Sequence, residues 1–236
     1  MITYDPRGLG RSKRKDGRVD NVPTIQADDV HAVIGTLGVG PVEMFASSSG
    51  AVTALALVAA YPSDVSLLVA HEPPLAPVRP DAEAAERAVS RFRDAYIANG
   101  WGVGMAAFVA MTAWRGEFTE DYFAQPAPDP AQFGMPTRDN GSRDDPLLRE
   151  RSAAITGYRP DFDALRAVPT RIVIGVGEES MGIFTGRASG ATAERLGHKA
   201  TIFPSHHGGF VGGDSGYAGQ PEVFARKLRA VLTEHN

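Results

Sequence analysis

Short β-branched runs alternate with helical patterns in the first and the last third of the chain. Amphipathic helices are indicated over residues 24–37, 188–196 and 221–235, because apolar side chains recur there at helical spacing. The alternation of strand and helix predicts an α/β fold with a mostly parallel sheet flanked by helices. Strands are predicted at residues 42–45, 65–70, 171–176 and 199–203, and residues 1–4 look like the end of another.

Two of the predicted helices have distinctive sequences. The helix over residues 24–37 has Thr24 available as its N-cap and Gly38 placed to end it. The helix over residues 51–61 is apolar on nearly every face, so it is expected to be buried.

The alternation stops between residues 75 and 167, where helical patterns take over. Residues 125–145 are rich in Pro, Gly, Asp and Asn and are predicted to be a loop. We therefore divide the chain into a core of residues 1–74 and 168–236 and a helical insertion of residues 75–167, called the lid below. Its aromatic and Met side chains suit an apolar small-molecule substrate. They are Trp101, Met105, Phe108, Met111, Trp114, Tyr122 and Phe123. For any one of them, packing within the lid is the commoner role.

A serine-rich turn joins the second predicted strand to the buried helix. It reads Ala46-Ser47-Ser48-Ser49-Gly50. Small residues two before and two after a central serine are typical of a nucleophile elbow, in which neighbouring chain is expected to leave room only for Gly or Ala. That frame selects Ser48 as the nucleophile, and the simpler alternative is a serine that only caps the helix.

At this turn the chain resembles the α/β-hydrolase superfamily, in its serine-dependent branch. Residues 4–12 are similar to the D-x-R-G-x-G-x-S turn that follows the fourth strand of that fold. The resemblance implies a base histidine after the last strand, where this chain has His206 and His207. His207 is preferred because Gly-Gly-Phe follows it, and the rival interpretation of the pair is a metal site, which adjacent residues seldom form.

The resemblance places the third member of a catalytic triad less clearly. The family's carboxylate often ends a G-x-x-D pattern, which here reads Gly177-Glu178-Glu179-Ser180. Some relatives carry the acid at the end of the preceding strand, which corresponds to Glu72. Glu72 is favoured and Glu179 comes next, while an ordinary solvated carboxylate is the alternative for both.

The family's oxyanion hole implies a role for the backbone N–H of Ser49. Its second donor comes from a loop after the family's third strand, and no such loop precedes residues 1–4. We therefore expect the chain to lack the first strands of the fold, and to fold poorly or associate as written. A version extended upstream is expected to be active.

Composition excludes several classes of function. The chain has no cysteine, which removes disulfides, a thiolate nucleophile and cysteine-ligated metals. The net charge is −4 and the basic residues are scattered, so no nucleic-acid surface is predicted. No apolar run is long enough to span a bilayer and there is no apolar signal core at the start, so a cytoplasmic location is the default.

Together these patterns predict a serine hydrolase that cleaves a small ester or related acyl compound without a metal or an organic cofactor. The rival hypothesis is a ligand-binding or degenerate member of the fold with little turnover, which the displaced acid and the missing oxyanion loop would favour. The sequence does not determine the oligomeric state.

Overall fold

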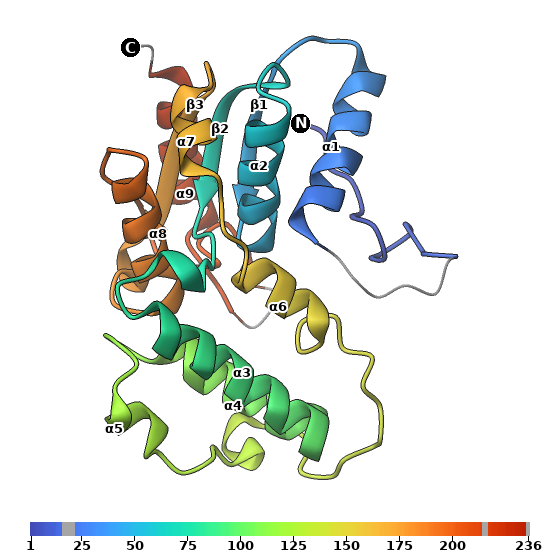
Figure 1. The fold of residues 1–236 in the computed structure, drawn as a ribbon, viewed down its shortest axis with the longest axis vertical. Coiled ribbons are helices and arrows are strands. Elements are labelled where there is room, and N and C mark those ends of the chain that lie inside the picture. Colours follow the sequence, from blue (N-terminus) through green and yellow to red (C-terminus); the bar gives the residue numbers. More distant parts are fainter. Residues whose placement is uncertain (16–21, 214–216, 235–236) are drawn as a thin grey trace.

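The computed structural model describes residues 1–15, 22–213 and 217–234. Its sheet has four parallel strands in the order β1-β2-β3-β4 (Figure 1). They are β1 (Val42–Ser47), β2 (Val65–His71), β3 (Arg171–Gly177) and β4 (Thr201–Phe203). The α/β class and the parallel sheet predicted from the alternating pattern are therefore confirmed.

The register of the sheet brings three strand ends together. Ser47 at the end of β1 lies opposite His71 at the end of β2, and His71 lies opposite Gly175 near the end of β3. Because the strands are parallel, their carboxyl ends meet at one edge of the sheet, where ligands of such folds usually bind. β2 is almost wholly buried, whereas β1 lies at the edge of the sheet and is only partly buried.

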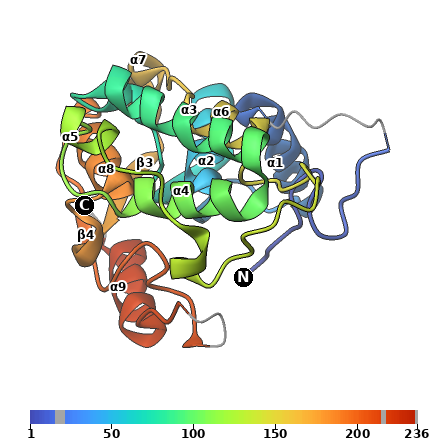
Figure 2. The ribbon, with the colours of Figure 1, turned by 90° about the horizontal axis from the view of Figure 1, so that it is seen from below.

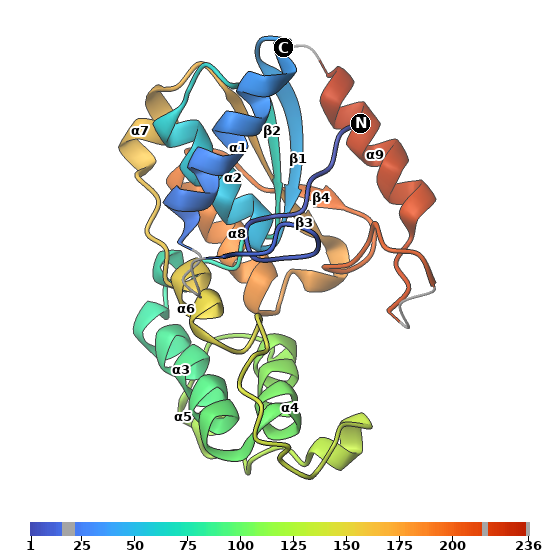
Figure 3. The same cartoon turned by 90° about the vertical axis from the view of Figure 1, so that its right-hand side faces the viewer.

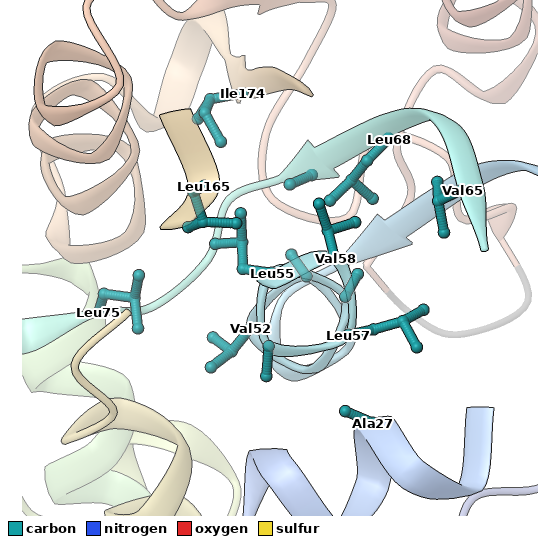
Figure 4. Close-up of a cluster of buried hydrophobic side chains, with 14 of the residues drawn as sticks. Ala27, Val52, Leu55, Leu57, Val58, Val65, Leu68, Leu75, Leu165 and Ile174 are labelled. Carbon is teal, nitrogen blue, oxygen red and sulfur yellow. The ribbon is translucent and has the colours of Figure 1, made fainter. Parts of the chain in front are cut away.

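Helices cover both faces of the sheet (Figure 3). α1 (Pro23–Leu37) and α2 (Ser49–Ala60) lie on one face with α7 (Phe162–Ala167) and α8 (Phe184–Arg195), and α9 (Pro221–Thr233) lies on the other. Figure 4 shows Leu55 and Val58 of α2 pointing toward β2, within a cluster of buried apolar side chains. α2 is buried along most of its length, as its uniformly apolar sequence predicts.

The lid contains its own apolar cluster. Its elements are η1 (Ala76–Val78), α3 (Ala82–Asn99), α4 (Trp101–Ala113), α5 (Glu120–Phe123), η2 (Pro130–Phe133) and α6 (Glu150–Thr156). α3 and α4 pack together around Phe92, Tyr96 and Met111, beyond the carboxyl ends of the strands (Figures 1 and 2). α7 belongs to the predicted lid by sequence, but Leu165 packs in the α2 cluster. The division at residue 167 stays a prediction.

Three details of the sequence interpretation are wrong. Residues 1–4 are not a strand, because no strand of the described sheet lies beyond β1 for them to pair with. Val22, not Thr24, is the N-cap of α1, since Pro23 occupies the first helical position, where a missing N–H costs nothing. The predicted loop 125–145 also contains η2. Gly38 does end α1, in the left-handed conformation expected of a helix terminator.

None of the helices in the described part of the chain is both long and apolar enough to cross a lipid bilayer.

Candidate active site

Ser48 occupies a strained turn between β1 and α2. Its backbone has φ 56° and ψ −125°, a conformation that a residue with a side chain adopts only when its surroundings impose it. The Ser48 N–H donates to the carbonyl of His71 at 2.9 Å, which ties the turn to the end of β2. The local geometry is that of a nucleophile elbow, with the amino terminus of α2 directly behind the serine.

The expectation that neighbouring chain leaves room only for a small residue at position 50 is wrong. A Cβ atom built on Gly50 would meet no atom within 4 Å, so no described neighbour demands glycine there. The positive φ of Ser48, and not crowding at Gly50, marks this turn as unusual.

His207 lies in the loop that follows β4. Its Nδ1 is 2.7 Å from Oε2 of Glu72, although 135 positions separate the two residues. The His207 side chain is 31% exposed, whereas that of Glu72 is fully buried. The imidazole therefore has one nitrogen held by a buried carboxylate and a ring that remains accessible from the cavity described below.

His206 points to different partners. Its Nδ1 accepts from the N–H of Gly208, and its Nε2 donates to the carbonyl of Ala218 at 3.0 Å. Its ring lies against that of Tyr217, tilted by 35°, with 3.9 Å between centroids. Both nitrogens are thus used in shaping the loop, and the two histidines do not converge on a common point as a metal site would require. Within the described ranges, no group of three metal-ligating side chains is found.

Glu72 is held by four polar neighbours. Besides His207, the Gly177 N–H donates to Oε1 at 2.8 Å, and the Thr185 hydroxyl donates to Oε2 in a short hydrogen bond. His71 contributes the fourth, a weaker contact. Burial alone would raise the pKa of Glu72, but the bonds from His207 and Thr185 outweigh it and lower the pKa to about 2. The carboxylate is therefore ionised at neutral pH.

The alternative acid does not reach the histidines. Glu179 is exposed, and between described residues its carboxylate makes no hydrogen bond to His206 or His207. Ser180, at the position where the family pattern expects an acid, is buried, and its hydroxyl has no partner among the described residues. Glu72 lies close to this position, because its N–H donates to the Gly175 carbonyl and its side chain accepts from the Gly177 N–H.

A cavity of about 700 Å³ joins the serine to the histidine. Ser48, Ser49 and His207 line it from the core, and most of the remaining wall is apolar and comes from the lid. Among the described residues that line it, none is Asp, Glu, Lys or Arg. The lid side chains in its wall include Phe92, Phe108, Val109, Met111, Leu147 and Ile155.

Sequence reasoning missed His71. This residue is fully buried, its Nδ1 lies 3.1 Å from the Ser47 hydroxyl, and burial lowers its pKa to about 4. The signal that could have found it is a histidine at the buried end of a strand, one position before the favoured acid.

The lowered pKa values of the buried neighbours His71 and Glu72 predict that the fold loses stability in acid. The unfolded chain binds a proton at His71 below pH 6.5, but the folded chain does so only near pH 4, so stability falls as the pH drops between these values. The expected loss is about 3 kcal/mol in the free energy of unfolding. Glu72, with its pKa lowered from 4.5 to about 2, extends the loss below pH 4.5.

Urea titrations at pH 6.5 and pH 4 measure this loss. His71→Gln, which cannot titrate, should show a smaller difference in stability between the two pH values than the parent protein. An equal difference in both proteins would contradict the assignment to His71.

Comparison with known proteins shows which family the chain belongs to. Residues 1–151 match the family model described as the alpha/beta hydrolase fold. The chain belongs to the α/β-hydrolase family. Hydrolase activity is accordingly supported at the level of the superfamily.

Individual relatives of this α/β-hydrolase are distant. It is 25% identical over 215 residues to the uncharacterized hydrolase YraK of Bacillus subtilis (strain 168), across 89% of this chain and 73% of YraK. Among solved structures, it resembles MGS-M2, an α/β-hydrolase enzyme from a Medee basin deep-sea metagenome library. The TM-score is 0.63 at 16% identity, over 99% of this chain and 79% of that one.

A thermophilic esterase from Thermogutta terrifontis is also similar in structure. The TM-score is 0.56 at 18% identity, over 97% of this chain and 77% of the esterase. At such identities the likeness shows the α/β-hydrolase fold alone.

Proposed function

We propose that this protein hydrolyses small, uncharged, largely apolar esters through an acyl-serine intermediate. The observation that carries the proposal is the 2.7 Å contact between His207 Nδ1 and Glu72 Oε2 beside a cavity that Ser48 also lines. A strained serine, a partly exposed imidazole and a buried carboxylate are the three parts that acyl transfer requires. The esterase-like structural neighbours are compatible with this choice.

In this mechanism the Ser48 hydroxyl attacks the ester carbonyl while His207 takes its proton. Collapse of the tetrahedral intermediate breaks the bond to the leaving alcohol, which receives that proton from His207. A water molecule then attacks the acyl-serine, again with His207 as base, and releases the acid and the free serine. Glu72 stays ionised throughout, keeps the proton on His207 Nδ1 and stabilises the imidazolium.

The negative charge of the tetrahedral intermediate would be met at the start of α2. The N–H of Ser49 belongs to the first turn of that helix, which has no intrahelical acceptor for it. A helix amino terminus also favours negative charge. Ser49 is thus the proposed oxyanion donor through its backbone.

The cavity wall selects the substrate class. Its volume of about 700 Å³ lies within the range of small-molecule sites, and the described residues of its wall include no Lys or Arg to pair with a substrate carboxylate. Burying an unpaired charge costs several kcal/mol, so an ester with a charged acyl chain should be excluded.

Two substrates of equal acyl-chain length test this selection. We expect kcat/KM for p-nitrophenyl hexanoate to exceed that for the p-nitrophenyl monoester of adipic acid by about 100-fold or more, because only the second carries a carboxylate into the cavity. Equal rates, or a preference for the adipate monoester, would contradict the proposed substrate class. Absence of turnover with any ester would favour the binding-protein hypothesis.

A further inference from the structure

His71 is a buried polar side chain that the proposed mechanism does not use. Its ring is fully buried at the end of β2, among the rings of Phe45, Phe203, Phe210 and Phe224 at centroid distances of 5.2 to 6.2 Å. Its Nε2 has no hydrogen-bond partner among the described residues. An imidazole in an aromatic cage, with one nitrogen unpaired, calls for a physical explanation, since buried polar atoms normally find partners.

The neighbours of the ring determine where its proton lies. Nδ1 is 3.1 Å from the Ser47 hydroxyl, which the strand register places opposite His71. Nε2 faces Oε1 of Glu72 at 4.0 Å. A bare nitrogen lone pair directed at a carboxylate oxygen would be repelled, whereas an N–H would be attracted. The neutral form with the proton on Nε2 therefore fits the site, with Ser47 donating to Nδ1.

The His71 ring also needs the space that Gly175 leaves on the neighbouring strand β3 by having no side chain. A Cβ atom at Gly175 would lie 3.3 Å from Cδ2 of His71 and within 3.0 Å of the Phe203 ring. Among the described residues, the titratable groups that face His71 are Glu72, directly after the end of β2, and His207 on the loop after β4. The other strands and α9 present Ser47, glycine and phenylalanine. Burial among these groups keeps the imidazole uncharged at neutral pH.

We infer that His71 is a positioning residue: its Nε2–H, oriented by Ser47, keeps the Glu72 carboxylate turned toward His207. Oε1 already accepts from Gly177, and Oε2 from Thr185 and His207. The Nε2–H dipole adds attraction on the Oε1 side, so that rotation of the carboxylate away from His207 is opposed. At 4.0 Å this is a polar contact and not a hydrogen bond, and its effect depends on the low polarity of the aromatic cage.

Two substitutions at position 71 separate positioning from packing. The side-chain amide of His71→Gln can place an N–H where Nε2 now lies, whereas that of His71→Asn reaches only the Nδ1 position. Both are polar and neither titrates, so they differ mainly in the group that faces Glu72. Ser47→Ala perturbs the same contact without altering the ring, and Ser66→Ala, on the exposed side of β2, is its matched control.

The readout is the proton on His207 Nδ1, which gives a downfield signal in proton NMR while Glu72 holds it. The signal should be unchanged in Ser66→Ala and in His71→Gln. It should move upfield or be lost to solvent exchange in His71→Asn, and move in the same direction in Ser47→Ala. An unchanged signal in both His71→Asn and Ser47→Ala would overturn the inference.

Kinetics supply the second readout, which rests on the proposed function. His71→Asn should lower kcat for p-nitrophenyl hexanoate by about 10- to 100-fold with KM unchanged, the range for a small misplacement of a reacting group, and His71→Gln should restore most of it. Equal kcat values in the parent and His71→Asn would overturn the role. If the parent protein shows no turnover while the NMR signal still responds as expected, the proposed function fails and the positioning of Glu72 by His71 stands.

Discussion

Replacing Ser48 with alanine should lower kcat for p-nitrophenyl hexanoate by about 10⁴- to 10⁶-fold, the loss that removal of a serine nucleophile causes in serine hydrolases. Without the hydroxyl no acyl-enzyme forms, and the only rate enhancement that remains comes from substrate binding and the oxyanion donor. Ester hydrolysis followed at 400 nm, with purified Ser48→Ala and the parent protein side by side, measures this loss.

The strain at Ser48 complicates a simple deletion, because alanine must adopt the same positive φ. Ser48→Gly removes both the hydroxyl and the strain, so it should be as inactive as Ser48→Ala yet more stable by about 1 kcal/mol. Ser66→Ala, on the exposed side of β2, should keep full activity. Substantial hydrolysis by both Ser48 variants would show that the nucleophile lies elsewhere.

The second large effect is expected at the acid. Glu72→Gln should reduce kcat by about 10⁴-fold, as in proteases whose buried triad acid is replaced by its amide. An amide cannot stabilise the imidazolium, and its NH₂ group can turn His207 into the wrong tautomer. Steady-state kinetics over a range of ester concentrations would show a loss in kcat and not in KM.

Glu179→Gln is the matched control for that change. It makes the same chemical substitution on an exposed side chain in the same region, and it should leave kcat unchanged because no described contact links this carboxylate to His207. A larger loss in Glu179→Gln than in Glu72→Gln would reverse the choice of acid.

The fold was predictable because its signals are local. The short strands β1 to β4 and the uniformly apolar helix α2 can be read from their own residues, and Gly38 ends α1 as its sequence indicates. The prediction of a strand at residues 1–4 is wrong, because a strand needs a neighbouring strand to pair with, and a local pattern does not show whether one is present.

The site was predictable only in part, for a related reason. The serine turn is a continuous sequence pattern, so Ser48 could be selected from it. The pairing of His207 with Glu72 depends on the register of β2 against β3, which places the Glu72 side chain beside Gly177. The contact of His71 with Ser47 depends on the register of β1 against β2. Such contacts arise between strands, and sequence spacing within one strand does not encode them.

For the lid, too, the sequence predicts the kind of side chain but not which of them face the cavity. Its aromatic and Met residues were expected to suit an apolar ligand, and some of them, such as Phe108 and Met111, do line the cavity. Others, such as Trp114 and Tyr122, pack within the lid cluster. Which side chains face the cavity is decided by how α3 and α4 pack together, and not by composition.

The proposed mechanism requires that Ser48 becomes acylated, and mass spectrometry of the trapped intermediate can detect this. The protein is mixed with p-nitrophenyl hexanoate, quenched in acid at short times, and digested for peptide mapping; a fluorophosphonate serves as a stable analogue. We expect a hexanoyl or phosphonyl adduct on Ser48 that is absent in Ser48→Ala. An adduct on another residue, or continued hydrolysis by the Ser48→Ala protein with no adduct at all, would contradict it.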